Sequence, residues 1–476
     1  MTLKDKVIRG LSWSVLSKLI VQIFSWVSTF LVLRFLVPED YAVMALVTIV
    51  TSFVSLFALN GFSAVLVRNR VEDAVLERQV FTLSLVIYVI YSAILYISSG
   101  YIAAFFDTEV LADVLFYYVF ALPFNSLLII PSAKFDIAMD FKSRAIMDSI
   151  SAFISSIVCL SLAYSGFGVW ALVFGDLTML GVKVILYLYV AKVFPRLCAD
   201  FTSAKNWFGF LFHLQVNSLI WYSYNKLDSL LIGRLIGMKE LGIYNVGVQV
   251  ASIPASKLSS IINQVGFSAF SSVNRDINLA KNYLQKAVRL TGMILFPVFI
   301  GIASVSENLV GVLMGEKWHE SASVIAIFCF IFPLRMINTI FQNFLNSMGM
   351  AKENVKNTMI TFSFVIVSIV LGSNYDVLGV AIGWLVGYVV SFNVILFRLA
   401  KISSISIFNW FFWLPFMINS FVMMVLVRLL THFSLLGLAP LSQLLWQVLI
   451  GSVYIIISYL TFFRRDLRVL RSLKSK

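Results

Sequence analysis

The sequence predicts an all-α polytopic membrane protein with about 14 transmembrane helices, built as two related six-helix lobes and a C-terminal helix pair. Composition is the first reason: 60% of the 476 residues are hydrophobic and only 12% are charged. The mean hydropathy is +0.93. Soluble domains carry about 25% charged residues, so this chain could not cover a water-facing surface of its length. The length of its apolar stretches and an internal repeat complete the argument.

Apolar stretches of roughly 18 or more residues have the length of a membrane span. The first, from Leu11 to Leu36, is too long for a signal-peptide core and is expected to be a retained helix. Pro131 leaves the boundary between the fourth and fifth stretches open. The candidate spans lie near residues 11–36, 41–67, 79–98, 110–130, 145–164, 168–191, 209–236, 240–270, 286–306, 321–345, 355–373, 377–398, 409–430 and 442–463.

The internal repeat shows most clearly in one phrase, GFSAVLVRNR at Gly61–Arg70 and GFSAFSSVNR at Gly266–Arg275. Weaker echoes join Pro123 with Pro333 and the pair Gly168-Val169 with Gly379-Val380. A repeat of about 200 residues in an apolar chain predicts two related helical bundles, and transporters hold their cargo between such bundles. We therefore expect an N-terminal lobe at 1–200, a C-terminal lobe at 201–402, and an added transmembrane hairpin with a basic tail at 403–476.

Basic residues predict the orientation. With the N-terminus in the cytoplasm, most of the 36 Lys and Arg residues fall in inner segments, as the positive-inside rule requires. The outer loops then hold only Arg34, Arg234, Lys239 and Lys317. The net charge of +13 is therefore an orientation signal, and nucleic acid is not expected as a partner.

Polar residues recur along four spans at helical spacing. In the first span, Ser14, Lys18, Gln22, Ser25 and Thr29 share one helix face. Lipid-facing helices do not tolerate such stripes, so we expect them to line a wet cavity. The alternative is that Ser and Thr bond their own backbone or join helices. The predicted cavity lining is Gln22, Ser25, Gln215, Tyr222, Asn225, Gln249 and Ser256.

Four cations lie within predicted spans: Lys18, Lys226, Lys257 and Arg335. Each would cost about 2.5–3.5 kcal/mol at the centre of a bilayer. Asp228 can offset one of them, most simply Lys226 or Lys257, or it can serve as a proton or sodium site. The other cations predict a negatively charged cargo, best a phosphate or pyrophosphate, unless they snorkel to the interface. We accept snorkelling for Lys183, which Asp176 could also neutralise.

Several segments resemble bacterial polysaccharide exporters of the Wzx type, in the multidrug, oligosaccharidyl-lipid and polysaccharide (MOP) exporter superfamily. They are NKLDSLLIGRLIGMKELGIYNVGVQV at Asn225–Val250, RGLSWSVLSKLIVQ at Arg9–Gln22, Gly168–Val173, and LMGEKW at Leu313–Trp318. The resemblance covers nearly the whole chain and is strongest to the colanic-acid and teichuronic-acid exporter branch. It implies two lobes that form a V and open alternately to each side of the bacterial inner membrane.

The resemblance also implies a function: flipping an undecaprenyl-pyrophosphate-linked oligosaccharide, of exopolysaccharide or O-antigen type, from the inner to the outer leaflet. Lys18 and Lys257 stand where related flippases keep cavity cations, although those relatives favour Arg, which grips phosphate bidentately. Trp26, Trp221, Tyr222 and Tyr224 offer faces on which sugars could stack. Membrane lipids, and polysaccharide polymerase or assembly proteins, are the expected partners.

Two other functions are alternatives for such a chain. A multidrug or organic-ion antiporter shares the architecture, but cationic cargo would favour acids over bases in the cavity. A membrane enzyme is disfavoured because His213, His319 and His432 are isolated and no long outer loop occurs. The cysteines Cys159, Cys198 and Cys329 fit neither a disulfide framework nor a metal site. We expect no catalytic residues, no metal and no cofactor.

Overall fold

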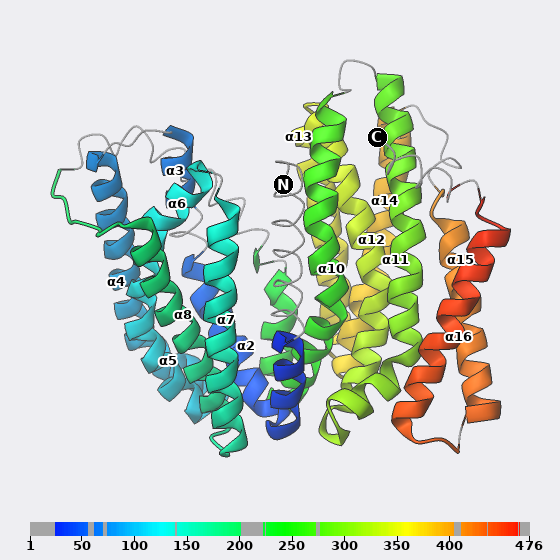
Figure 1. The fold of residues 1–476 in the computed structure, drawn as a ribbon, viewed down its shortest axis with the longest axis horizontal. Coiled ribbons are helices and arrows are strands. Elements are labelled where there is room, and N and C mark those ends of the chain that lie inside the picture. Colours follow the sequence, from blue (N-terminus) through cyan, green and yellow to red (C-terminus); the bar gives the residue numbers. More distant parts are fainter. Residues whose placement is uncertain are drawn as a thin grey trace, which may run out of the picture. The chain divides into compact units, whose positions relative to one another are not determined.

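The computed structural model describes residues 24–55, 61–69, 74–138, 140–200, 222–223, 225–272, 277–403, 411–435, 437–464 and 466. Within these ranges every regular element is helical, which confirms the predicted all-α class (Figure 1). Ten of the described helical stretches are long and apolar enough to cross a membrane. Each of the fourteen predicted spans that lies in the described ranges overlaps a helix.

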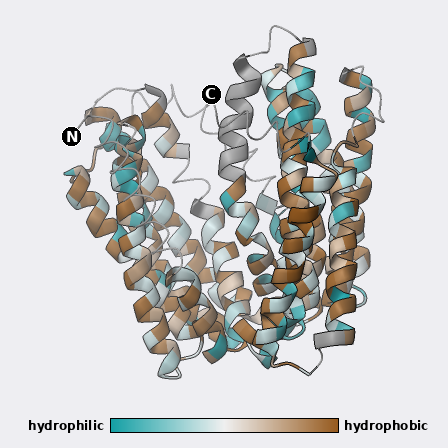
Figure 2. Cartoon of the chain, turned by 45° about the vertical axis from the view of Figure 1, so that its right-hand side comes forward, coloured by the Kyte–Doolittle hydropathy of each residue, from teal (hydrophilic) through white to brown (hydrophobic). Residues whose placement is uncertain are grey.

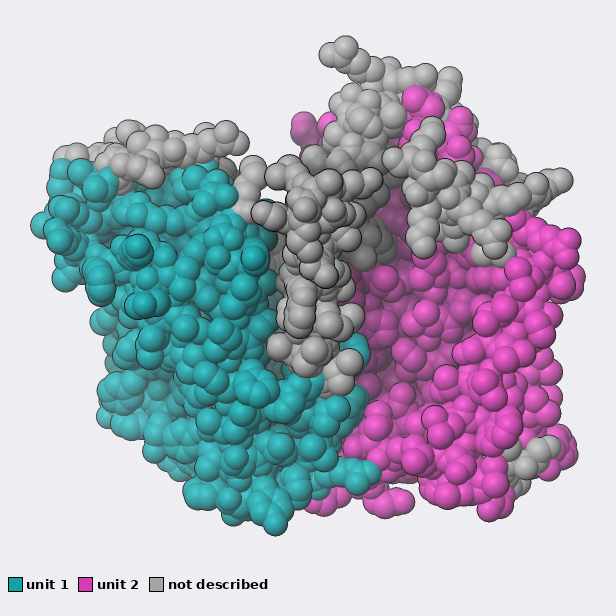
Figure 3. Space-filling model, viewed as in Figure 1, with its two compact units in different colours: residues 1–242 teal, residues 243–476 magenta. Residues whose placement is uncertain are grey.

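The chain divides into two compact units, residues 1–242 and 243–476 (Figure 3). Each unit is described by itself below. The predicted division into 1–200, 201–402 and 403–476 follows the repeat and stays a prediction.

In the first unit, the long helices pack as neighbours in sequence: α4 on α5, and α7 on α8. Helix α7 begins where the Asp140 carboxylate accepts a hydrogen bond from the Ser143 backbone N–H at 3.0 Å, an N-cap that satisfies one of the unpaired amides of a helix start. The elements are Phe24–Phe35, α2 (Pro38–Ser55), α3 (Gly61–Asn69), α4 (Ala74–Phe105), α5 (Glu109–Ala121), the 3₁₀ segment η2 (Leu122–Leu128), α6 (Ile129–Ile137), α7 (Phe141–Tyr164), α8 (Val169–Ala191) and a helix over 225–235.

The second unit takes in most of α10 (Met238–Ser272), which begins just before the boundary between the units. Its closest helix pairs are α13 with α14 and α11 with α12. Its other elements are α11 (Ile277–Leu313), η3 (Glu316–Trp318), α12 (Ser321–Ser347), α13 (Ala351–Gly372), α14 (Val377–Ser403), α15 (Leu414–Leu430), the π-helical turn η5 (Thr431–Leu435) and α16 (Pro440–Thr461).

The repeat is visible in the packing within each unit. The pair α4–α5 corresponds to α11–α12, and α7–α8 corresponds to α13–α14, and each pair is in direct contact. The two copies of the GFSA phrase differ in setting, however. The first copy begins the short helix α3 at Gly61, whereas the second lies inside the last turns of the long helix α10. The related halves therefore share helix pairing but not every helix boundary.

Proline positions explain one boundary that the sequence left open. The fourth span is a continuous helical run, Glu109–Ile137, and Pro131 lies inside α6 without ending it. The irregularity lies earlier, in the 3₁₀ segment η2, whose second residue is Pro123. Proline lacks the N–H that an α-helix needs, and the start of a helical segment tolerates that loss. In the second unit the related Pro333 lies within an uninterrupted α12.

Large apolar side chains on the outer faces of the helices are exposed, as a lipid-facing surface requires. Ile97 and Tyr101 of α4 are 72% and 80% exposed. Figure 2 shows hydrophobic residues along the length of the long helices. In water such continuous exposed apolar area would be an aggregation hazard. The chain is therefore a multi-pass membrane protein.

Glycines bring α13 and α14 unusually close together. Gly379, Gly383 and Gly387 recur at every fourth position of α14 and so share one face. A Cβ atom added at Gly383 would collide with the Ser368 carbonyl oxygen, and one at Gly387 would lie 2.8 Å from the Phe364 carbonyl oxygen. Small residues at such spacing let membrane helices approach until their backbones touch.

Amide and hydroxyl side chains join the C-terminal hairpin α15–α16 together and to α11. The Asn308 amide of α11 donates to Gln447 of α16 at 3.1 Å. Between the hairpin's two helices, the Ser458 hydroxyl donates to Asn419 Oδ1 at 2.6 Å. Such bonds in a membrane are worth roughly 0.6 to 2 kcal/mol each. The hairpin thus packs firmly on α11.

Candidate functional site

The predicted polar face of α10 is present in the second unit. Gln249, Ser256 and Lys257 are exposed, while Ala251 and Ala255 on the same helix are buried. The Ser256 hydroxyl donates to the Ile253 carbonyl at 2.8 Å. This bond to the helix's own backbone is the alternative to a cavity role for a single hydroxyl. Their role in lining a cavity stays a prediction.

Arg335 lies near the middle of α12 and is half-buried. Its guanidinium carbon lies 5.4 Å from the Trp384 ring centroid on α14 and 5.8 Å from that of Phe332. Aromatic faces attract a cation and replace part of the water it loses. This arrangement fixes the guanidinium at membrane depth.

The helix over 225–235 carries three of the predicted residues in the first unit. Asn225 and Lys226 are half-buried, and Asp228 is only 5% exposed. The Asp228 Oδ1 atom accepts a hydrogen bond from the Ser229 backbone N–H at 2.6 Å. Residues two positions apart on a helix point in different directions, so helix geometry disfavours pairing of Lys226 with Asp228. Asp228 as an ion-coupling or ion-pair residue stays a prediction.

Tyr222 is buried against α2. Its hydroxyl donates to the Ile49 carbonyl, and its ring meets the Phe53 ring edge-on at 6.3 Å. The Tyr91 hydroxyl of α4 donates to the adjacent carbonyl, that of Val50, at 2.8 Å. With 8% of its surface exposed, Tyr222 has little face left for stacking on a sugar. We therefore assign Tyr222 a packing contact with α2. Its predicted role in lining a cavity stays a prediction.

The remaining predicted residues lie mainly outside the described part of the chain. The predicted residues outside the described ranges are Lys18, Gln22, Gln215, Trp221 and Tyr224. Ser25 is described and half-buried, and its carbonyl accepts a hydrogen bond from the Thr29 hydroxyl at 2.8 Å. Ser25 and Thr29 are therefore on one face, as the helical spacing predicts.

The structure corrects the suggested pairing of Lys183 with Asp176. Lys183 forms an ion pair with Asp148 of α7 at 2.8 Å, and Tyr187 donates to the same carboxylate at 3.0 Å. Asp176 instead accepts from the Tyr118 hydroxyl of α5 at 2.7 Å. Seven residues of α-helix separate Asp176 from Lys183, about 10 Å along the axis. The neighbouring helix offers the nearer partner, which sequence spacing alone does not reveal.

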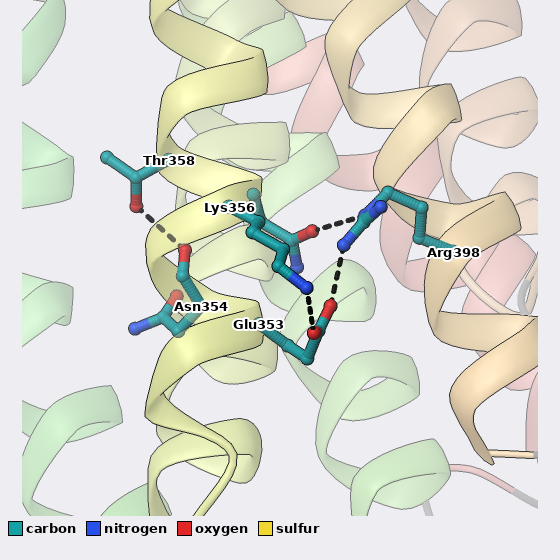
Figure 4. Close-up of polar contacts among 6 residues, drawn as sticks. Glu353, Asn354, Lys356, Thr358 and Arg398 are labelled. Atoms are coloured by element: carbon teal, nitrogen blue, oxygen red, sulfur yellow. Dashed lines mark hydrogen bonds and ion pairs between the residues drawn. The ribbon is translucent and has the colours of Figure 1, made fainter.

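A second ion-paired cluster joins α13 to α14 in the other unit (Figure 4). The Arg398 guanidinium donates to Glu353 at 2.6 Å and to the Asn357 side-chain oxygen at 3.0 Å. Lys356 forms an ion pair with the other oxygen of Glu353 at 2.6 Å. The Asp148 cluster joins α7 to α8, and the Glu353 cluster joins α13 to α14. Each cluster thus joins the two helices of one pair, and the repeat relates the two pairs.

Replacing Arg398 by Ala is expected to lower the free energy of unfolding by about 1–3 kcal/mol, because two bonds to a half-buried cation are lost. Thermal unfolding of the purified protein in detergent measures the change. Lys401→Ala, an exposed position on the same helix, is the matched control. Equal unfolding midpoints for the two variants would show that the cluster adds nothing to stability.

The fold and these residues define a polytopic helical membrane protein. In fold it is similar to the lipid II flippase MurJ in an inward closed conformation, with a TM-score of 0.78, 15% identity, and 95% of this chain and 99% of that chain covered. It is also similar to an inward-facing multidrug resistance transporter (MATE family, MOP superfamily), with a TM-score of 0.60, 13% identity, and 80% and 96% of the two chains covered.

The chain belongs to the polysaccharide biosynthesis protein family, whose profile matches residues 31–323. It is 29% identical over 257 residues to the lipopolysaccharide biosynthesis protein WzxC of Escherichia coli K12, covering 52% of this chain and 51% of WzxC. The match thus spans about half of that relative. It is 24% identical over 346 residues to the teichuronic acid biosynthesis protein TuaB of Bacillus subtilis 168, covering 71% of this chain and 70% of TuaB. This confirms the resemblance found in the sequence.

Proposed function

We propose that this protein is a flippase that moves a polyprenyl-pyrophosphate-linked oligosaccharide from the inner to the outer leaflet of the cytoplasmic membrane. The observation that carries the proposal is the combination of family and fold. The family is that of polysaccharide biosynthesis proteins, and the fold, over 95% of the chain, is that of a lipid II flippase. A further relative is named as the succinoglycan biosynthesis transport protein ExoT of Rhizobium meliloti.

The described cations support this choice of cargo. Lys257 is exposed on a polar helix face, and Arg335 is fixed at membrane depth by aromatic rings. A diphosphate offers such cations the negative charge that hydrocarbon does not. The lobes would alternate between inward-open and outward-open states that bind this cargo with different affinity. In this scheme the polyprenyl chain remains in lipid and the protein carries out transport without catalysing a reaction.

A multidrug or organic-ion antiporter is the second candidate, because the MATE transporter shares the fold with a TM-score of 0.60. Cationic cargo would require acids where α10 and α12 present Lys257 and Arg335. The lower similarity and the sign of these charges both favour the flippase.

The location is proposed from charge distribution. Ten spans make the chain a multi-pass membrane protein. By the positive-inside rule, the distribution of basic residues supports a cytoplasmic position for both termini. The partners proposed are the lipid-linked oligosaccharide, membrane lipids, and polymerase or assembly proteins that consume the flipped product.

In cells that lack this protein, radiolabelled lipid-linked oligosaccharide is expected to accumulate in the inner leaflet, because synthesis continues while translocation stops. A leaflet-resolved assay with a membrane-impermeant glycosidase measures the distribution. Restoring the gene should restore outer-leaflet label. An unchanged distribution together with altered tolerance to cationic toxins would favour the antiporter instead.

A further inference from the structure

A polar cavity lies at the beginning of α11, apart from the residues discussed for the cargo. It measures about 430 Å³. Six residues of α11 and one aromatic residue ahead of α15 form its wall. Its lining includes Asn282, Tyr283, Gln285, Lys286, Arg289 and Phe412. A cavity with this many hydrogen-bond donors suits a small polar ligand better than an acyl chain.

The carboxylate of Asp466 fixes the position of the Arg289 guanidinium. Its Nε and Nη2 atoms donate to the two carboxylate oxygens of Asp466 at 2.5 and 3.0 Å, and Asp466 is only 7% exposed. The guanidinium also lies 5.8 Å from the Phe416 ring centroid. A guanidinium has five N–H donors, and Asp466 takes two. The others remain for a ligand, on a group whose position is already fixed.

Lys286 supplies positive charge to the same cavity. It lies one helical turn before Arg289 and is exposed, so the two cationic groups are on one face of α11. Asp466 offsets the charge of Arg289. Among the described residues Lys286 forms no ion pair within 4 Å. The cavity therefore has a net positive character and favours an anion.

The position along α11 decides between a lipid and a free anion. The apolar stretch of α11 begins at Leu279, and the exposed Leu279 and Tyr283 adjoin the cavity. Cations at the edge of a span, beside exposed apolar side chains, meet phospholipid headgroups and acyl chains together. A free phosphate would gain nothing from the apolar Leu279 or Phe412.

We propose that this cavity binds the phosphodiester headgroup of an anionic phospholipid. The phosphate accepts hydrogen bonds from Lys286 and Arg289, and Asn282 and Gln285 contact the polar remainder of the headgroup. The acyl chains lie against Leu279 and Tyr283. Because α15 and α16 pack on α11, the lipid also covers the base of the C-terminal hairpin. The inference is independent of the cargo that the protein transports.

The test is lipid retention by the full-length protein. The protein is reconstituted in nanodiscs containing equal parts of phosphatidylglycerol and phosphatidylcholine, and the lipid retained after transfer to detergent is measured by native mass spectrometry. The wild type is expected to keep phosphatidylglycerol preferentially. Lys286→Glu should lower that preference by about five-fold or more, since one basic residue near the surface is worth about 1 kcal/mol.

Two further variants keep the test decisive. Arg289→Lys preserves the charge beside Asp466 but loses the two-point hydrogen bonding of the guanidinium. It should weaken retention of phosphatidylglycerol less than Lys286→Glu does. Lys281→Ala, on the same helix but outside the cavity lining, should retain the wild-type preference. The proposal is overturned if Lys286→Glu keeps that preference, or if millimolar inorganic phosphate displaces the bound lipid completely, which would identify a free-anion site.

Discussion

Lys257→Ala and Arg335→Ala are each expected to slow the flipping of lipid-linked oligosaccharide by about 10-fold to 100-fold. A hydrogen bond to a charged group contributes about 1.5–3 kcal/mol, and each 1.4 kcal/mol is a factor of ten. Lys257 is exposed on α10 and Arg335 is half-buried between α12 and α14. The measurement is the rate of transfer of a defined lipid-linked oligosaccharide in proteoliposomes.

The conservative variant Arg335→Lys separates charge from shape. Lysine keeps the charge but cannot stack its ammonium on Trp384 and Phe332 as a planar guanidinium does, so flipping should fall between the wild type and Arg335→Ala. Lys317→Ala, at an exposed position in η3, is the control and should flip normally. Normal rates for both alanine variants would remove these residues from the transport path, and loss of protein from the membrane would assign them a structural role.

Gly383→Val is expected to lower the free energy of unfolding by about 3 kcal/mol or more, because the added side chain meets the backbone of α13. Inserting atoms into a packed contact usually costs 1–3 kcal/mol, and a carbonyl group cannot move aside as a flexible side chain can. A Cβ at Gly383 would collide with the Ser368 carbonyl oxygen. The expected signs are a lower unfolding midpoint in detergent and less protein in the membrane.

Gly311→Val is the matched control on α11 of the same unit. A Cβ at Gly311 has no heavy atom within 4 Å, so this variant carries the same intrinsic helix propensity change without the collision. If the two variants unfold alike, helix propensity and not the close contact of α13 with α14 determines the loss.

Periodicity and hydrophobicity predict the membrane helices well, because these depend on local sequence. The span predicted at 145–164 is the helix Phe141–Tyr164, and that at 168–191 is Val169–Ala191. Partner choice across helices was less predictable: Lys183 takes Asp148 and not Asp176, since helix packing determines which carboxylate is near.

The repeat-related glycines Gly168 and Gly379 show that a repeat in sequence does not reveal why a residue recurs. Gly168 precedes α8 with φ +56°, a backbone conformation that glycine adopts most readily. Its counterpart Gly379 lies within α14, where it is needed because the Gly372 carbonyl approaches it. The same residue recurs for two different physical reasons, and only the coordinates distinguish them.

Some features of the candidate site could be predicted from the sequence and others could not. Gln249, Ser256 and Lys257, which the sequence predicts as cavity residues, are exposed on α10, and their role in a cavity stays a prediction. Sequence spacing could not foresee that Tyr222 bonds the α2 backbone or that aromatic rings surround Arg335, because residues far apart in the chain make these contacts. The basic cavity of Lys286 and Arg289 was missed altogether, since Asp466 lies 177 positions beyond Arg289.

The 3₁₀ segment η2 makes the two halves mechanically unequal. Hydrogen bonds in a 3₁₀ helix have poorer geometry than those of an α-helix, and each residue advances about 2.0 Å instead of 1.5 Å. Leu122–Leu128 is thus a joint of weaker hydrogen bonding within the fourth crossing. The equivalent helix in the other half, Ser321–Ser347, continues through its proline without interruption. Bending of the fourth crossing is expected to concentrate at that joint.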